Sequence, residues 1–210
     1  MTSPLQRAVE VMDRLRSPGG CPWDAAQTHE SLTRYLLEEA YEVIEAIETD
    51  DVALLREELG DLLLQVLFHA RLAEELPPEQ AFGIEDVAAD LVAKLIRRHP
   101  HVFADAEAGT SEQLNETWER QKIEEKGRTS AVDGVPVAQP ALALAAKLVS
   151  RADRAGLAVP TPEEDEIGAR LFAVVSDAAR VGIDPETALR RTARAYREAI
   201  VAAETKSPSQ

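Results

Sequence analysis

Hydrophobic residues recur every three or four positions along most of the chain, which is the spacing of an α-helix with one apolar face. The first such run places Leu5, Val9, Met12 and Leu15 on one side before a Ser-Pro-Gly-Gly segment interrupts it. Further helices are predicted at about 31–48, 51–76, 84–98 and 110–126, and from about 140, 161 and 184 onward. Because no segment alternates polar and apolar residues over the length of a strand, the sequence predicts an all-α fold.

Helix-start signals and turn residues support these limits and divide the chain in two. Asp51 and Asp184 are of the residue type that caps a helix N-terminus, and Thr110-x-x-Gln113 has the spacing of a capping box. Residues 127–140 contain two glycines and two prolines, a composition typical of a linker. We therefore expect one domain at 1–128 and a second domain at 129–210.

Acidic charge is concentrated in one part of the chain. The 210 residues include 38 Asp and Glu against 23 Lys and Arg, and residues 30–90 alone hold 17 acids and 3 bases. This balance disfavours a nucleic-acid polymer as partner, and no apolar run reaches the roughly 18 residues of a membrane span. The single cysteine, Cys21, fits a cytoplasmic protein without disulfides. A dense carboxylate cluster is costly unless it is solvated or binds cations, so metal chemistry is expected within 30–90.

Two carboxylate pairs lie on the second and third predicted helices. Glu39 and Glu42 belong to an EExxE motif, and Glu58 and Asp61 belong to an ExxD motif. Residues at i and i+3 share one helix face with Cβ atoms about 5–6 Å apart. A short turn at Thr49-Asp50-Asp51 allows the two helices to run antiparallel, which can bring the pairs face to face. Four oxygen ligands on rigid helices suit a hard cation such as Mg²⁺.

A solvated acidic helix face is the alternative explanation, and it is the commoner one for any two glutamates at this spacing. Two features weaken it here. Apolar residues such as Leu36, Val43, Leu59 and Leu62 flank each pair. Gly60 also interrupts a helix interior, where glycine costs about 1 kcal/mol relative to alanine, and this suggests a close approach between helices.

Several blocks of sequence occur in an order that identifies a family. They are Gly20-Cys21-Pro22-Trp23-Asp24, the EExxE motif, Glu58-Leu59-Gly60-Asp61-Leu62-Leu63, the run from Arg97 to Phe103 and Trp118-Glu119. Over residues 1–126 the chain strongly resembles the MazG nucleoside triphosphate pyrophosphohydrolases. The resemblance implies an all-α fold in which a homodimer completes a four-helix core. It also implies Mg²⁺-dependent hydrolysis of NTPs or dNTPs to the monophosphate and pyrophosphate, as in the house-cleaning of nucleotide pools.

The same resemblance assigns residues to the site. Glu39, Glu42, Glu58 and Asp61 would be the ligands of Mg²⁺, with Mn²⁺ as a possible substitute. Glu38 would be catalytic, and whether it orients a ligand or the attacking water stays open. The bound cation would lower the pKa of a water molecule that attacks the α-phosphorus.

Cationic and aromatic residues complete the expected substrate site. Lys94, Arg97 and Arg98 form a basic patch that, without the resemblance, is equally well explained by charges complementing a helix C-terminus. By resemblance, Lys94 and Arg98 contact the phosphates, and Trp118 stacks on or beside the nucleotide. Trp23 is expected to be a structural anchor. Nothing in the sequence specifies the base or the sugar.

Two other classes of protein remain as alternatives. A four-helix di-iron carboxylate protein also carries glutamates on facing helices, but it uses Glu-x-x-His pairs, and here the second members are Glu42 and Asp61. A regulatory module that binds nucleotide or metal without hydrolysis is the other alternative. Nucleotide binding without turnover would be the evidence for such a module.

Residues 129–210 resemble a degenerate second copy of the first domain. When Glu166 is aligned with Glu58, the metal aspartate is replaced by Ala169, and too few residues precede the aligned segment for a second EExxE helix. Ala195 and Ala199 occupy the positions that correspond to Lys94 and about Arg98. We therefore expect this half to be inactive and to pack against the first half or a second subunit.

Overall fold

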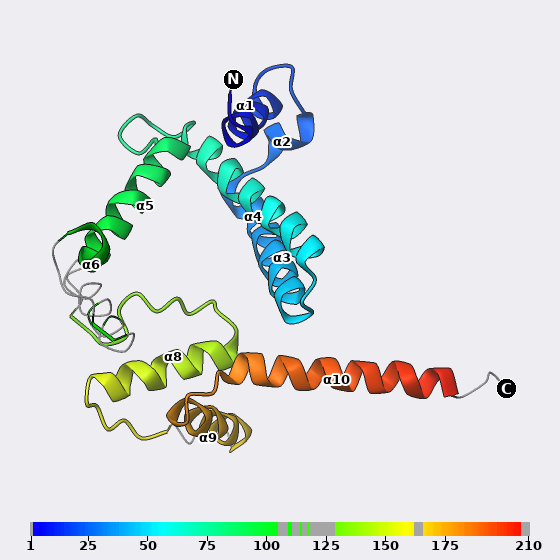
Figure 1. Cartoon of the computed structure of the whole chain (residues 1–210), viewed down its shortest axis with the longest axis vertical. Helices are drawn as coiled ribbons and strands as arrows, with labels where there is room; N and C mark the ends of the chain where they lie inside the picture. Colours follow the sequence, from blue (N-terminus) through cyan, green and yellow to red (C-terminus); the bar gives the residue numbers. More distant parts are fainter. Residues whose placement is uncertain are drawn as a thin grey trace. The chain divides into compact units, whose positions relative to one another are not determined.

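The computed structural model describes residues 2–104, 109–110, 114, 117, 129–161 and 166–206. All regular structure in these residues is helical, which confirms the predicted all-α class (Figure 1). The chain forms two compact units, Met1–Thr110 and Ser111–Gln210. No helix in the described part of the chain is long and apolar enough to span a bilayer.

The first unit contains two long helices and several shorter ones. The helices are α1 (Pro4–Arg16), α2 (Pro22–Ala26), α3 (His29–Glu48), α4 (Val52–Ala73), α5 (Ile84–Arg98) and α6 (Pro100–Phe103). The four longer ones agree with the predicted helices to within a few residues. Helices α2 and α6 were not predicted, because segments of five and four residues are too short to show an apolar period.

Helices α3 and α4 form an antiparallel hairpin, and they make the most extensive helix contact in the unit (Figure 1). The turn between them includes Asp50 in the left-handed region, with φ of 55°. Asp51 caps α4, because its Oδ1 accepts hydrogen bonds from the backbone N–H groups of Ala53 and Leu54 at 3.1 and 3.0 Å. The predicted cap and the predicted antiparallel turn are therefore confirmed.

The apolar core of this unit lies at the end of the hairpin away from the turn. Its buried members are Met12 of α1, Leu32 of α3, and Leu67, Phe68 and Leu72 of α4. Trp23 of α2 meets the Phe68 ring edge-on, with ring centroids 6.5 Å apart, and also contacts a tyrosine of α3. Helices α1 and α2 thus hold the open end of the hairpin together.

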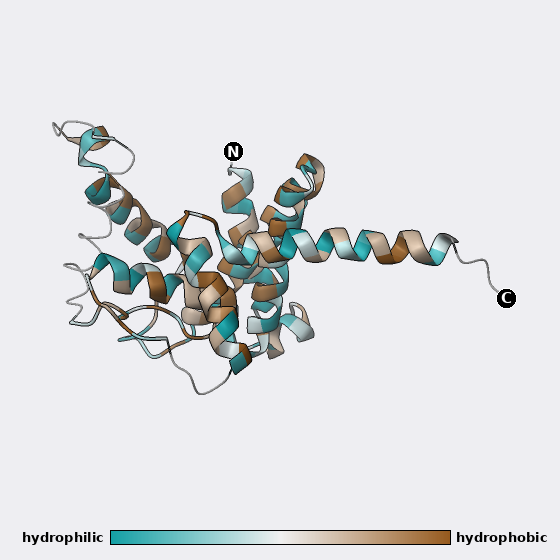
Figure 2. Ribbon diagram, turned by 90° about the horizontal axis from the view of Figure 1, so that it is seen from below, coloured by the Kyte–Doolittle hydropathy of each residue, from teal (hydrophilic) through white to brown (hydrophobic). Residues whose placement is uncertain are grey.

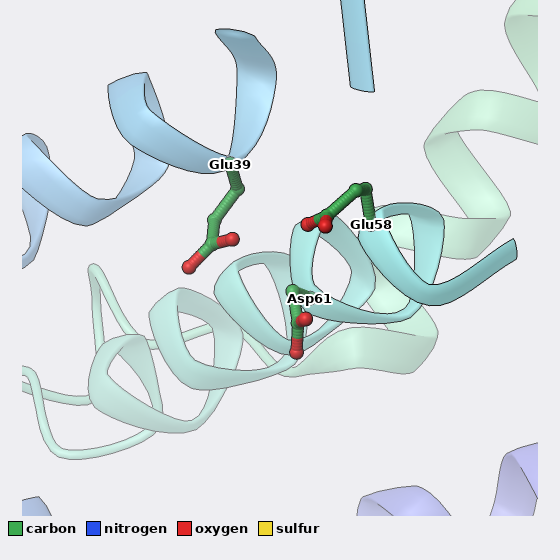
Figure 3. Close-up of side chains that lie close together, drawn as sticks. All are labelled: Glu39, Glu58 and Asp61. Carbon is green, nitrogen blue, oxygen red and sulfur yellow. The ribbon is translucent and has the colours of Figure 1, made fainter. Parts of the chain in front are cut away.

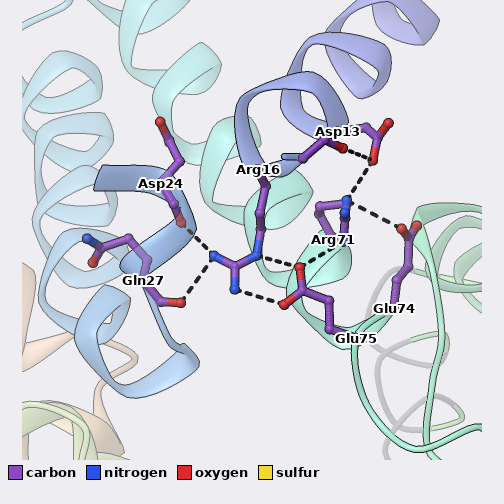
Figure 4. Close-up of polar contacts among 8 residues, drawn as sticks. Asp13, Arg16, Asp24, Gln27, Arg71, Glu74 and Glu75 are labelled. Carbon is purple, nitrogen blue, oxygen red and sulfur yellow. Dashed lines mark hydrogen bonds and ion pairs between the residues drawn. The ribbon is translucent and has the colours of Figure 1, made fainter. Parts of the chain in front are cut away.

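Arg16 connects three elements around this core (Figure 4). Its side chain is only 7% exposed and donates to both carboxylate oxygens of Glu75, at 2.8 and 2.9 Å. The same guanidinium donates to the carbonyl oxygens of Asp24 and Gln27 at the end of α2. Arg71 adds ion pairs to Asp13 and to Glu75.

The second unit contains α8 (Ala141–Arg154), α9 (Glu166–Arg180) and α10 (Pro185–Lys206), which contact one another. The predicted cap at Asp184 is confirmed, because its Oδ1 accepts from the Thr187 N–H at 2.7 Å. Figure 2 shows hydrophobic and hydrophilic segments alternating along α10 toward the C-terminus, where Tyr196 is 69% and Ile200 is 45% exposed. The capping box expected at 110–113 and the helix start expected near 161 lie at least partly outside the described residues.

We predict that Arg16→Ala lowers the free energy of unfolding of the first unit by about 2–3 kcal/mol, since hydrogen bonds of charged groups contribute about 1.5–3 kcal/mol each. Urea unfolding followed by Trp23 fluorescence, in a Trp118→Phe background, measures this change. Arg7→Ala is the control. Arg7 pairs with Glu10 on the exposed face of α1, and its loss should change the value by less than about 0.5 kcal/mol.

Wild type and Arg16→Ala also differ in how their stability depends on pH. Hydrogen bonds and charge attraction from Arg16 and then Arg71 hold the pKa of Glu75 below its ordinary value of 4.5. The resulting stabilisation is present above that value and is lost as pH falls through the lowered pKa. The difference in free energy of unfolding between wild type and Arg16→Ala should therefore become smaller as the pH falls through the lowered pKa of Glu75. If Arg16→Ala and Arg7→Ala lowered the free energy of unfolding equally at neutral pH, this role of Arg16 would be contradicted.

Candidate metal centre

Three carboxylates meet near the middle of the hairpin. Glu39 lies on α3, and Glu58 and Asp61 lie one turn apart on α4 (Figure 3). Each offers a carboxylate oxygen, and these three oxygens all lie within 4.8 Å of one another. The antiparallel hairpin brings the two helices together, and the i,i+3 spacing places both α4 carboxylates on the face toward Glu39.

The carboxylates perturb one another. Glu58 is buried, with 9% exposure, and Glu39 and Asp61 are half-buried. Burial is the main factor that raises the pKa of Glu39, followed by the charge of Asp61. Burial is also the main factor that raises the pKa of Glu58, followed by the charge of Glu42 and then of Asp61. Among the described groups that shift these two pKa values, every charged one is a carboxylate.

Glu42 and Glu38 occupy different positions relative to this group. The Glu42 carboxyl is among the groups that raise the pKa values of Glu39 and Glu58, so it adjoins the group although its own position is exposed. Glu38 is exposed on α3 as well. The structure thus brings together three of the four expected ligands with the fourth alongside, and the catalytic role of Glu38 stays a prediction.

The donor set fits a hard divalent cation. All donors in the group are carboxylate oxygens, which Mg²⁺ and Mn²⁺ prefer over nitrogen or sulfur. Holding these negative groups within 4.8 Å and partly out of water is unfavourable unless a positive charge compensates them. Burial first, and then repulsion from the neighbouring carboxylates, raise the pKa values of Glu39 and Glu58.

Gly60 does not mark a close approach between helices of one chain. Apart from its own stretch of helix, a Cβ atom built on it would meet no heavy atom of the described residues within 4 Å. The expectation from the sequence is therefore wrong at this point. The reason is that Gly60 is exposed on α4, whereas Asp61, the next residue, is turned partly inward toward Glu39.

The expected phosphate-binding residues lie on another helix. Lys94, Arg97 and Arg98 are in the last turns of α5, and Figure 1 shows α5 diverging from the α3–α4 hairpin. None of the three is among the described groups that shift the pKa values of Glu39 and Glu58. Trp118 lies outside the described residues.

Two histidines, one on α3 and one on α4, pair with each other. His29 and His69 stack with ring centroids 5.0 Å apart, and their Nδ1 atoms are 2.7 Å apart. Burial, together with the charge of His29, lowers the pKa of His69. The sequence did not reveal this pair because its members lie on different helices. No Glu-x-x-His ligand set of the di-iron type is thus formed in the described group.

A hollow of about 300 Å³ lies between α1, α4 and the start of α5. Its lining includes Val9, Met12, Leu67 and Ile84, with Arg71 among the polar residues at its wall. None of the candidate site residues that the structure describes lines it. It belongs to the packing of α1 against α4 and is not the place where the carboxylates would meet a substrate.

Comparison with known proteins places this geometry in a family. The profile of the MazG nucleotide pyrophosphohydrolase domain matches residues 27–103, a range that includes the carboxylates and the basic end of α5 but not Trp118. An uncharacterized 26.1 kDa protein of Streptomyces cacaoi is 54% identical over 203 residues, which are 95% of this chain and 82% of that protein.

Two proteins of Thermotoga maritima are also similar. The nucleoside triphosphate pyrophosphohydrolase/pyrophosphatase MazG is 41% identical over 218 residues, covering 92% of this chain and 83% of that protein. The crystal structure of a MazG-related protein has 31% identity and a TM-score of 0.46, covering 56% of this chain and 97% of that one. The 41% identity to the Thermotoga pyrophosphohydrolase extends over most of both proteins. It shows that the chain belongs to the MazG family of nucleoside triphosphate pyrophosphohydrolases.

Proposed function

We propose that the chain hydrolyses nucleoside triphosphates to the monophosphate and pyrophosphate in a reaction that depends on Mg²⁺, with Mn²⁺ as a substitute. The observation that carries the proposal is the convergence of Glu39, Glu58 and Asp61 within the region that matches the family. The name of the Thermotoga relative supports the same activity. The proposed substrates include canonical and damaged nucleoside triphosphates, as a role in the house-cleaning of nucleotide pools requires.

The carboxylates would hold the cation. Glu39, Glu58 and Asp61 supply oxygens directly, and Glu42 completes the set from the next turn of α3. A bound divalent cation supplies positive charge at the phosphates and a water molecule of lowered pKa. Because the ligands lie on two rigid helices, they are positioned before the substrate arrives.

Other residues of the chain would bind and orient the triphosphate. The oxygen of a water molecule would bond to the α-phosphorus while its proton passes to the solvent, the bond from that phosphorus to the bridging oxygen would break, and pyrophosphate would leave with that bond's electrons. Lys94, Arg97 and Arg98 would neutralise the departing pyrophosphate, and Trp118 would stack on the base. Glu38 would orient a ligand or the attacking water by accepting a hydrogen bond.

The remaining expectations complete the proposal. The catalytic domain would be 1–128, and 129–210 would be an inactive helical repeat that serves packing. The protein would act as a cytoplasmic homodimer on small nucleotides, without a nucleic-acid polymer or membrane as partner. The exposed apolar residues of both units support an assembly of subunits.

The first prediction for this site concerns metal binding without substrate. At pH 7.5, Glu58→Gln should raise the Tm in EDTA. It removes a charge whose ionisation is disfavoured in the folded state, a cost present once the pH exceeds the raised pKa. In wild type, added Mg²⁺ should raise the Tm progressively, and Glu58→Gln should abolish most of that rise. Differential scanning calorimetry measures both effects.

Glu45→Gln is the matched control for this experiment. Glu45 lies on the same hairpin and is exposed, and it is absent from the described carboxylate group. Its variant should keep the Mg²⁺-dependent rise in Tm. If Glu58→Gln also kept the full rise, these carboxylates would not be the metal ligands.

The second prediction concerns turnover. Incubation with a panel of dNTPs and Mg²⁺, resolved by ion exchange, should give the monophosphate and pyrophosphate. Asp61→Asn should lower kcat by at least about 100-fold, with the helical circular dichroism spectrum unchanged. Glu166→Gln is the matched control, because Glu166 aligns with Glu58 in the second half and should not affect turnover.

Several outcomes would contradict the proposed function. A diphosphate with orthophosphate as products would indicate attack at a different phosphorus. Tight nucleotide binding with no turnover would favour a regulatory module. A marked drop in kcat for Glu166→Gln would show that the second half takes part in catalysis.

A further inference from the structure

A buried glutamine on α4 has an enclosed polar atom that the packing of the helix does not explain. Among the described residues of the first unit, only Glu58 and Gln65 are both polar and buried, with exposures of 9% and 4%. The Oε1 atom of Gln65 is enclosed and has no hydrogen-bond partner among the described residues. An amide oxygen buried in this way destabilises the folded chain. Its place on a well-packed helix therefore calls for a partner that the chain itself does not supply.

Helix geometry places this glutamine beside the candidate metal centre. Gln65 lies one turn beyond Asp61 and two turns beyond Glu58 on α4, so the three residues share one face of the helix. That face presents Glu58 and Asp61 to Glu39 of α3 (Figure 3). A long side chain on a helix leans back over the turn that precedes its own Cα atom. For Gln65 that turn contains Asp61, so the register directs its amide toward the carboxylates.

The apolar core on the other side of Gln65 gives its amide no use. One turn further along the same face lies Phe68, which belongs with Leu32 of α3 to the buried core. Tyr35 of α3 packs against this core, and its hydroxyl is already paired with the guanidinium of Arg34. An apolar side chain at position 65 would pack here without an unsatisfied polar atom. The amide is therefore better explained by the carboxylate side than by the core side.

A hydrated divalent cation carries the donors that a buried amide oxygen needs. This step rests on the proposed function, in which Glu39, Glu58 and Asp61 hold Mg²⁺ or Mn²⁺. Mg²⁺ bound by carboxylates keeps several of its water molecules. Hydrogen-bond partners around a metal centre fix the orientation of the groups bound to the metal. An amide oxygen can accept such a hydrogen bond without adding a further negative charge to the carboxylates.

We propose that Gln65 is a positioning residue of this centre, and that its amide oxygen accepts a hydrogen bond from a water molecule in the hydration shell of the bound cation. The hydrogen bond satisfies the buried oxygen and orients the water molecule beside Asp61. Gln65 therefore destabilises the chain without the cation and strengthens binding of the cation. A glutamine that served only packing would have neither effect.

Gln65→Met separates these two roles in the full chain. Methionine has nearly the size of glutamine and lacks its polar amide. The Tm in EDTA, measured by differential scanning calorimetry, should rise by about 2–4 °C because the unsatisfied oxygen is removed. The Kd for Mn²⁺ without nucleotide, measured from the electron paramagnetic resonance signal of the free ion, should rise by about 10-fold.

Two further variants make the comparison specific. Gln65→Glu keeps an acceptor oxygen but buries another carboxyl beside Asp61. It should lower the Tm in EDTA and bind Mn²⁺ at least as tightly as wild type. Gln80→Met is the matched control, because Gln80 is exposed in the segment between α4 and α5. It should leave both the Tm in EDTA and the Kd for Mn²⁺ unchanged.

The Kd for Mn²⁺ decides between the outcomes. If Gln65→Met bound Mn²⁺ as tightly as wild type, Gln65 would serve packing alone and the proposal would be overturned. Weaker binding of Mn²⁺ to Gln65→Glu than to Gln65→Met would also overturn it, because the acceptor oxygen would then have no role. Failure of the proposed metal centre has a different signature: wild type and Glu58→Gln would bind Mn²⁺ equally. The two failures are therefore distinguishable.

Discussion

Repulsion between carboxylates is the constraint on which the first unit depends. Glu39, Glu58 and Asp61 are held within 4.8 Å of one another and partly shielded from water, an arrangement that a folded chain tolerates only when its helices are fixed by other contacts or when a cation binds. The fold supplies the first condition through the long α3–α4 contact. A divalent cation would supply the second, which couples stability of the hairpin to occupancy of the site.

The contacts that resist this repulsion lie at the ends of the hairpin. At one end, Asp51 caps α4 and the turn is closed by backbone in the left-handed region. At the other, α1 and α2 pack on Phe68, and Arg16 joins the end of α2 to Glu75 beyond α4. The middle of the hairpin is thereby left with few apolar contacts and an acidic surface. The apolar core and the carboxylate group therefore occupy different parts of the same two helices.

The sequence predicts much of this arrangement because helices and their caps are local. The period of Leu55, Leu59 and Leu62, the cap at Asp51 and the short turn together place Glu39 opposite Glu58 and Asp61. The sequence does not predict contacts between residues that are far apart along the chain. The bidentate pair of Arg16 with Glu75 spans 59 positions and has no sequence signature, and the stacking of His29 on His69 joins two helices. Gly60 was misread because a helical glycine can face solvent as readily as a neighbouring helix.

The central claim is that the three converging carboxylates hold the divalent cation of a triphosphate pyrophosphohydrolase. Its most direct test is the anomalous signal of Mn²⁺ in crystals of the full chain grown with a non-hydrolysable triphosphate. The account predicts an anomalous peak about 2.1–2.2 Å from carboxylate oxygens of Glu39, Glu58 and Asp61. A triphosphate bound with its Mn²⁺ away from these three side chains would contradict it.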